Sequence, residues 1–214
     1  VAKGTFARYY SPVGPAWPFE RQALVKLRPI AGDVEFGAEI VALRDQLVYT
    51  GEPFDLASMR GMRERQIREL VQAGQFNAKL SYGGLVDCEY FVQALQITFG
   101  KDCAPLRSAN TRAALRTLEQ IGILSDRLPL RNAYRFFRRL IDALRMVRGD
   151  ARDLNVPPIE SDEFEFLERR LAASLEGAPL EAELARHSQT VRDHLQRLDA
   201  LIAQSSPRQS PSVE

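Results

Sequence analysis

Apolar residues recur at helical spacing along most of the chain. Between Leu85 and Phe99, for example, the apolar side chains gather on one face of a helical wheel. No stretch alternates apolar and polar residues as a half-buried strand does, and no internal repeat is present. The spacing predicts helices over residues 20–28, 36–47, 59–71, 85–99, 111–121, 130–147, 160–175 and 180–203.

Turn-forming residues separate these predicted helices. Residues 1–18 are rich in aromatic residues, Pro and Gly, and we expect them to be irregular. The sequence GEPF at residues 51–54 predicts a turn and a domain boundary, and Gly122 stands where a helix is expected to end. The pattern therefore predicts an all-α protein: a small helical segment (residues 1–52), a bundle of about five or six helices (residues 53–203) and a Ser/Pro/Gln-rich, disordered tail (residues 204–214).

Composition narrows the class of protein. The 214 residues carry 29 Lys and Arg against 28 Asp and Glu, a net charge of +1, which argues against a nucleic-acid-binding protein. No apolar run approaches the ~20 residues that cross a bilayer, and no signal-peptide pattern opens the chain. The two cysteines do not form a disulfide framework, so we expect a cytoplasmic protein. Because the chain begins at Val1, we also expect a fragment of a longer protein.

A pair of glycines, Gly83 and Gly84, precedes the helix predicted from residue 85. Glycines at a helix N-terminus let backbone amides approach a phosphate or carboxylate, although a tight turn between two helices is the better explanation of a Gly-Gly pair taken alone. Asp87 lies in the first helical turn, where a carboxylate stabilises the helix dipole. Asp87 and Glu89 point about 200° apart on a helix, which argues against a shared metal ion.

Arginines line one side of the helix predicted over residues 130–147, at positions 131, 135, 138 and 145. The opposite side is apolar and predicted to be buried. Asp142 interrupts the basic side and is expected to pair with Arg138, four residues before it. The stripe of Arg131, Arg135, Arg138 and Arg145 fits two interpretations: a solvated face, or a cradle for phosphate or for an acidic protein surface.

The remaining candidates for chemistry are weak. His187 and His194 stand seven residues apart, about 10.5 Å along a helix, which is too far to chelate one metal ion, so we expect packing roles. Cys88 falls on the apolar face of its predicted helix. The sequence holds no Gly-x-Ser-x-Gly motif, Walker-type loop, dinucleotide fingerprint or His-Glu-x-x-His motif.

Several segments together resemble glutamine-synthetase adenylyltransferase, over nearly the whole chain to about residue 203. The most specific is FNAKLSYGGLVDCEYFVQALQ at residues 76–96, with Gly-Gly-Leu-Val-Asp-x-Glu and Gln93. The others are FERQALVKLRPIAGD at residues 19–33, PLR at 105–107, AYRFFRR at 133–139 and LNVPP at 154–158.

The resemblance implies a function for both predicted segments. Members of this family transfer AMP from ATP to a tyrosine of glutamine synthetase, or remove it by phosphorolysis, under control of the PII signal protein. Residues 1–52 then correspond to the tail of a nucleotidyltransferase domain, and residues 53–203 to the helical bundle that follows it. The resemblance leaves open whether the chain matches the adenylylating or the deadenylylating half.

The resemblance also assigns candidate binding residues. The family's catalytic signature, a Gly-Ser followed by an Asp-x-Asp pair that holds magnesium, is not matched here, so we expect this chain to be inactive alone. ATP and magnesium are expected for the longer enzyme. The residues expected to face the nucleotide are Lys79, as a point charge for phosphate, Gly83 and Gly84, through their amides, and Glu89 and Gln93, which would orient neighbours. A non-catalytic regulatory bundle that docks an acidic partner through the arginine stripe is the alternative.

Overall fold

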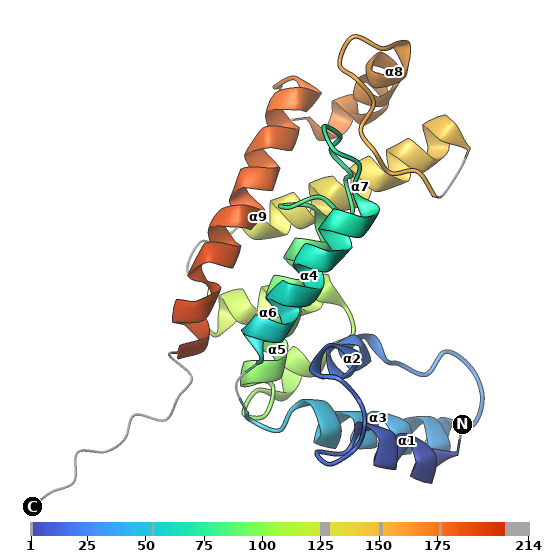
Figure 1. The fold of residues 1–214 in the computed structure, drawn as a ribbon, viewed down its shortest axis with the longest axis vertical. Coiled ribbons are helices and arrows are strands. Elements are labelled where there is room, and N and C mark those ends of the chain that lie inside the picture. The colour runs from blue at the N-terminus through green and yellow to red at the C-terminus, as the bar shows by residue number, and fades with distance from the viewer. Residues whose placement is uncertain (1, 53, 125–128, 150–151, 176, 204–214) are drawn as a thin grey trace, which may run out of the picture. The chain divides into compact units, whose positions relative to one another are not determined.

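The computed structural model describes residues 2–52, 54–124, 129–149, 152–175 and 177–203, except for the side chain of Pro18. Within these residues the fold is all-α, as predicted, with an isolated bridge between Asn77 and Asn155 but no strand. The predicted tail from residue 204 lies outside the described residues. The helices are α1 (Lys3–Tyr10), α2 (Pro18–Ala23), α3 (Val34–Val48), α4 (Leu56–Leu70), α5 (Leu85–Phe99), α6 (Thr111–Gln120), α7 (Pro129–Arg148), α8 (Asp162–Leu171) and α9 (Leu180–Ala203), shown in Figure 1.

The chain divides into two compact units. The first contains residues 1–60, 92–124 and 197–214, and the second contains residues 61–91 and 125–196. Three helices, α4, α5 and α9, therefore contribute residues to both units. The boundary that the sequence places after residue 52 lies within the first unit, and it stays a prediction about the family's domains.

Helix α1 is not expected from the sequence, which predicts irregular structure over residues 1–18. Phe6 and Tyr10, one turn apart on α1, contact each other with their rings tilted and the ring centroids 4.9 Å apart. Both pack against the core cluster of the first unit, whose buried members are Leu24, Val25, Val48 and Tyr49. Tertiary packing of the two aromatic rings thus outweighs the weak helix propensity of this segment.

A buried arginine ties together the irregular segments of the first unit. Arg44 on α3 is 4% exposed, and its guanidinium donates to the carbonyls of Val25, Leu27 and Arg107. Its charge is balanced by Asp45, with an Nε to Oδ1 distance of 2.6 Å. A charged donor that satisfies several carbonyls at once fixes the short 3-10 turn after α2 (Leu24–Lys26) against α3.

Helix ends follow local sequence signals. Asn110 caps α6, because its side chain accepts hydrogen bonds from the amides of Arg112 and Ala113, and Ser161 caps α8 in the same way. Gly122 adopts a positive φ of 75° directly after α6, as the sequence predicts for a helix terminus. The predicted helix over residues 160–175 is shorter in the structure: α8 ends at Leu171 and continues as a 3-10 turn (Ala172–Ser174).

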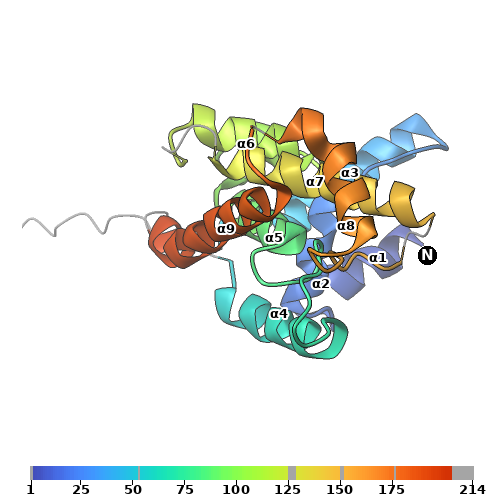
Figure 2. The same ribbon diagram turned by 90° about the horizontal axis from the view of Figure 1, so that it is seen from above.

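Helix α7 is the main apolar element of the second unit. Tyr134, Phe137, Ile141 and Leu144 are buried, as predicted, and α8 packs beside α7 (Figure 2). The ring of Phe137 also stacks with that of Phe76 from the loop before α5, at 6.3 Å. The amphipathic pattern of α7 therefore fixes which of its residues are left facing outward. None of the helices in the described segments has both the length and the apolar composition needed to cross a membrane.

Candidate functional site

The loop before α5 is held by its own side chains. The carboxamide Oδ1 of Asn77 accepts hydrogen bonds from the amides of Lys79 and Leu80, at 3.1 and 2.9 Å. The hydroxyl of Ser81 accepts from the amide of Asn77 at 2.7 Å, and the carbonyl of Ser81 accepts from the amide of Gly84 at 2.9 Å. Asn and Ser are common in such turns because their short polar side chains replace missing backbone partners.

A buried ion pair fixes this loop to α4. Asp87, only 2% exposed, pairs with the Nε atom of Arg63, which is 6% exposed. The second carboxylate oxygen of Asp87 accepts from the amide of Gly83 at 2.6 Å, while Nη2 of Arg63 donates to the carbonyls of Leu80 and Ser81. Burial raises the pKa of Asp87, and the Arg63 charge and the Gly83 amide offset part of that rise. The sequence gives Asp87 only a dipole role, and it misses the contribution of Arg63.

The structure assigns different environments to the five residues predicted to face a nucleotide. Lys79 is exposed, Glu89 is half-buried on α5, and Gly83 and Gly84 are buried with both amides already bonded. Gln93 belongs to the first unit, where it is 5% exposed and accepts a hydrogen bond from the Gln22 carboxamide at 2.7 Å. As a nucleotide site, these five residues stay a prediction.

These residues do not fit a magnesium ion. The two carboxylate oxygens of Asp87 are occupied by Arg63 and by the Gly83 amide. Within the described residues, no three His, Cys, Asp or Glu side chains lie close enough together to hold a metal ion. Proteins usually hold Mg²⁺ through one or two carboxylates with free oxygens, and both oxygens of Asp87 are already occupied.

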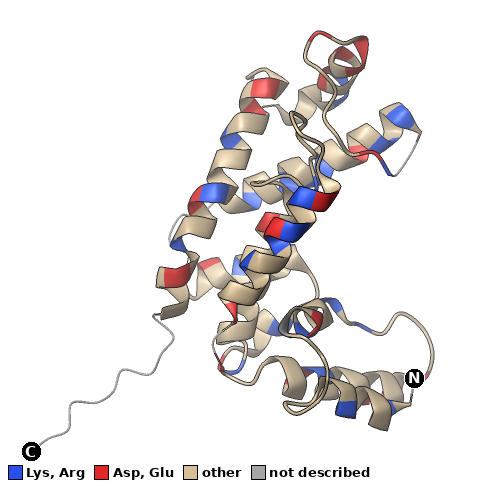
Figure 3. Cartoon of the chain, in the orientation of Figure 1, with Lys and Arg blue, Asp and Glu red and all other residues tan. Residues whose placement is uncertain are grey.

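The predicted arginine stripe lies along the outward side of α7, where basic residues recur along the helix (Figure 3). Arg135, Arg138 and Arg145 are exposed and Arg131 is partly exposed. Asp142 pairs with Arg145, at 3.5 Å, and not with Arg138 as the sequence predicts. Three-residue and four-residue spacings both place helix side chains close together, so spacing alone could not choose between the two partners.

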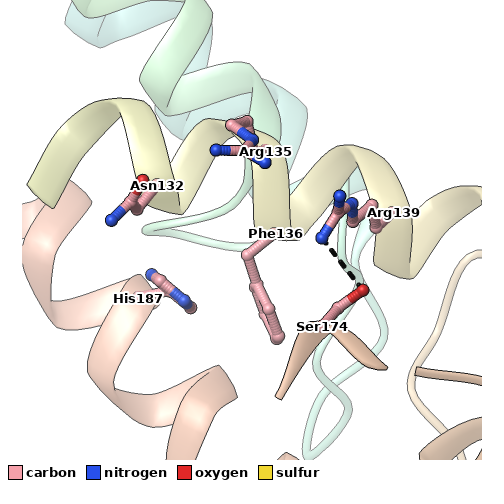
Figure 4. Close-up of a pocket in the computed structure, with 6 residues that line it drawn as sticks. All are labelled: Asn132, Arg135, Phe136, Arg139, Ser174 and His187. Atoms are coloured by element: carbon pink, nitrogen blue, oxygen red, sulfur yellow. Dashed lines mark hydrogen bonds between the residues drawn. The ribbon is translucent and has the colours of Figure 1, made fainter. Parts of the chain in front are cut away.

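A small pocket opens beside this stripe, with a volume of about 70 Å³. Figure 4 shows Arg139 and Ser174 meeting on one side of it, His187 on the other, and the Phe136 ring between them. The guanidinium of Arg139 donates to the Ser174 hydroxyl at 3.0 Å. The residues that line the pocket are Asn132, Arg135, Phe136, Arg139, Ser174 and His187.

His187 forms the inner wall of the pocket and is 4% exposed. Its ring stacks on Phe136 with centroids 4.4 Å apart, and its Nε2 atom lies 3.3 Å from Glu183 and 3.1 Å from Arg186. Burial and, to a smaller extent, the charge of Arg186 lower the pKa of His187 to about 4, although Glu183 opposes both. This environment agrees with the packing role predicted for His187. The packing role predicted for His194 agrees with its own contact, because its ring meets that of Phe91 edge-on with centroids 5.6 Å apart.

The sequence misses the pocket as a unit. Its lining residues come from α7, from the 3-10 turn after α8 and from α9, so they are up to 55 positions apart in the chain. Arg139 carries the one available signal, because it follows Arg135 by four residues and therefore shares a side of the helix. Nothing in the local sequence of Ser174 or His187 indicates a pocket.

A larger hollow of about 520 Å³ lies elsewhere in the second unit, lined by residues of the 74–76 loop, the 153–159 loop, α8 and α9. Arg148 is the one cation among its lining residues, and it pairs with both Asp153 and Glu163. Glu181 adds a further carboxylate. The balance of charge in this hollow is acidic, so an anion does not fit there.

Comparison with known proteins identifies the family of the chain. Residues 57–202 match the family described as GlnD PII-uridylyltransferase. The chain is 34% identical over 190 residues to a bifunctional glutamine synthetase adenylyltransferase/adenylyl-removing enzyme of Streptomyces avermitilis, which covers 86% of this chain and 19% of the relative. Enzymes of the same name from Streptomyces coelicolor and Thioalkalivibrio sulfidiphilus are 35% and 33% identical, and cover 78% and 92% of the chain.

The chain spans about a fifth of the length of the curated relatives it matches, between 16% and 20% of the three proteins named above. The match of the family model begins shortly after the predicted turn at residues 51–54 and continues almost to the end of α9. It therefore includes both the Gly-Gly turn and the arginine stripe. The relationship to the glutamine synthetase adenylyltransferases is the one that the sequence motifs predict, and the family model places the chain in the GlnD PII-uridylyltransferase family.

Proposed function

We propose that this chain is the helical part of a nucleotidyltransferase that adds AMP to glutamine synthetase or removes it. The observation that carries the proposal is its similarity to bifunctional glutamine synthetase adenylyltransferases over 86% of its length. The family name adds a second link, because it names PII as the protein that is modified. Glutamine synthetase and PII are therefore the proposed protein partners. A chain with only two cysteines, Cys88 and Cys103, has no disulfide framework, which supports a cytoplasmic setting.

In this proposal the loop at residues 77–84 presents Lys79 to the phosphates of ATP bound by the longer protein. Lys79 suits this role because it is exposed, while the amide at its base is held by Asn77. The Arg63–Asp87 pair makes the loop rigid, so that little order has to be gained on binding. Gly83 and Gly84 support the loop through their own hydrogen bonds, and Glu89 and Gln93 position the neighbouring side chains.

The first test is calorimetric titration of the chain with Mg-ATP, repeated with Lys79→Ala and with Lys101→Ala as the control. Both lysines are exposed, so each variant removes one surface charge without disturbing the core. We expect Lys79→Ala to weaken binding while Lys101→Ala leaves it unchanged. In the longer enzyme Lys79→Ala should lower AMP transfer as well. Equal effects of the two variants would exclude a specific role for Lys79.

A second candidate function is the docking of an acidic protein surface by the arginine stripe. It is favoured by Arg135 and Arg138, which are exposed and have no carboxylate partner among the residues that the structure describes. Arginine suits such a surface because its planar fork binds carboxylates with two hydrogen bonds. Arg135→Glu and Arg138→Glu should then abolish binding of the acidic partner, while Lys79→Ala should leave that binding intact. The opposite result supports the nucleotide role.

A further inference from the structure

The pocket beside α7 has the size of a small ion. A cavity needs about 10–15 Å³ of volume to hold one water-sized sphere, so the pocket of about 70 Å³ holds roughly five such spheres. Five heavy atoms is the size of a tetrahedral oxyanion such as phosphate or sulfate. A nucleotide is several times larger. The pocket can therefore enclose one phosphate-sized group and little more.

Its lining carries two arginines, Arg135 and Arg139, and no Asp or Glu of the described residues is among the lining residues. Arg139 donates to the neutral Ser174 hydroxyl, and neither Arg135 nor Arg139 has a carboxylate partner within the described part of the chain. The nearby Glu183 is already paired with Arg186, at 2.6 Å. Two unneutralised guanidinium groups on the wall of one cavity attract an anion, because their planar donors match its oxygens.

On the buried side of the pocket, a nitrogen of His187 lacks a hydrogen-bond partner within the described residues. His187 is only 4% exposed, and its buried Nδ1 atom makes no hydrogen bond in the described structure. Buried polar atoms nearly always have a partner, so an atom without one is a sign of a missing ligand. The Nε2 atom of the same ring faces Glu183 and Arg186, so Nδ1 is the ring nitrogen of this pocket residue that has no partner within the described residues.

We propose that this pocket binds a free tetrahedral oxyanion of the phosphate class. Arg135 and Arg139 bind its oxygens by charge-assisted hydrogen bonds, and the Ser174 hydroxyl and the Asn132 carboxamide add neutral donors. His187 closes the inner end and donates through Nδ1 once that nitrogen carries a proton. The Phe136 ring keeps the imidazole in place by stacking on it. The site is separate from the role proposed for Lys79.

Isothermal titration calorimetry of the 214-residue chain with inorganic phosphate, at constant ionic strength, tests this site. Arg139→Gln should weaken binding by about tenfold or more, the effect of losing one charge-assisted hydrogen bond. Arg138→Gln is the matched control, since Arg138 is exposed on the same helix but does not line the pocket. Its affinity should stay unchanged. Absence of binding, or equal losses in the two variants, would overturn the proposal.

Two further measurements decide the nature of the site. Sulfate should compete with phosphate, while AMP should bind no better than phosphate does, because its nucleoside has no room in the pocket. Tighter binding of AMP would mean a nucleotide site and would overturn the proposal. In NMR titrations, phosphate should raise the pKa of His187 from about 4, because an adjacent anion stabilises the imidazolium. An unchanged His187 pKa would exclude contact between this ring and the anion.

Discussion

Two regions of the second unit, the Gly-Gly turn before α5 and the outward side of α7, use their polar groups in opposite ways. In the turn, the amides of Gly83 and Gly84 are bonded within the loop, and Asp87 is buried against Arg63. On α7, Arg135 and Arg139 lack carboxylate partners among the described residues. The region with the more recognisable motif is thus committed to stability. The region with the less specific motif keeps its hydrogen-bonding capacity for a ligand.

Breaking the ion pair of the turn should have the largest effect. Asp87→Ala leaves the guanidinium of Arg63 buried without its counter-charge and frees the Gly83 amide. Removing one partner of a buried pair costs about 3–5 kcal/mol, and we expect a loss of that size in the free energy of unfolding measured with urea. The double variant Arg63→Met with Asp87→Leu is the control.

The double variant should recover most of the loss, since no charge is left without a partner. If Asp87→Ala costs less than about 1 kcal/mol, the turn is not held by this pair. The contrast between the turn and α7 would then lose its physical basis.

Gly83→Ala should come next, because this position combines two kinds of strain. Gly83 has a φ of +82°, and an added Cβ would lie 2.4 Å from the hydroxyl oxygen and 2.7 Å from the carbonyl oxygen of Ser188. The left-handed backbone costs about 1–2 kcal/mol and the clash about 1–3 kcal/mol, so we expect a loss of about 2–5 kcal/mol in urea unfolding.

Gly74 supplies the matched control for that substitution. Its φ is +76°, and nothing lies within 4 Å of its added Cβ. Gly74→Ala should therefore show the backbone cost alone, about 1–2 kcal/mol. Equal losses at the two positions would mean that the turn yields to the clash and is not rigid.

The helices were predictable because they depend on local spacing. The predicted ranges 85–99 and 180–203 are those of α5 and α9 in the structure. Helix α1 was missed because its stability comes from Phe6 and Tyr10 packing on the core cluster of the first unit, a contact between distant segments. Periodicity records which face of a helix is apolar, but not whether a short segment finds a surface to cover.

The candidate sites were less predictable, since their partners are far apart in the chain. Asp87 is visible as a first-turn carboxylate, but Arg63 stands 24 residues earlier and has no motif of its own. The pocket likewise joins Arg139 to Ser174, 35 residues later, and to His187. Sequence spacing identified the arginine side of α7, and only the tertiary structure identifies what lies beside it.

The buried inner wall of the pocket, unlike its exposed arginines, should make the stability of the chain depend on pH, because His187 titrates there. His187 has a pKa near 6.5 in the unfolded chain and about 4 in the folded chain, because burial and the charge of Arg186 disfavour the imidazolium more than Glu183 favours it. Between these values the unfolded chain binds a proton that the folded chain does not, so stability should fall as the pH is lowered from about 6.5 to 4.

The size of this effect follows from the shift. A shift of this size corresponds to about 3 kcal/mol at about 1.4 kcal/mol per pKa unit, which solvent screening reduces to about 1–2 kcal/mol. Urea unfolding at a series of pH values measures it. His187→Gln should flatten the curve over this interval, and an unchanged slope would assign the titration to another group.

The smallest expected effect is that of Arg135→Gln, which should stabilise the chain, whereas the substitutions above destabilise it. Arg135 lies one helical turn from both Arg138 and Arg139, and like charges at these spacings destabilise a helix by about 0.2–0.5 kcal/mol. Arg135→Gln should therefore stabilise the chain by about that amount at low salt, and the gain should vanish at 1 M salt, where charges are screened within about 3 Å.

Asp142→Asn, which removes the partner of Arg145, should instead cost up to about 0.5 kcal/mol. Urea midpoints at two salt concentrations distinguish the two signs. A gain at Arg135 would mean that this charge is kept although it weakens the fold, as expected of a residue retained for a ligand or a partner. A loss of stability in Arg135→Gln would mean that this α7 arginine is structural, as Arg63 is at the turn.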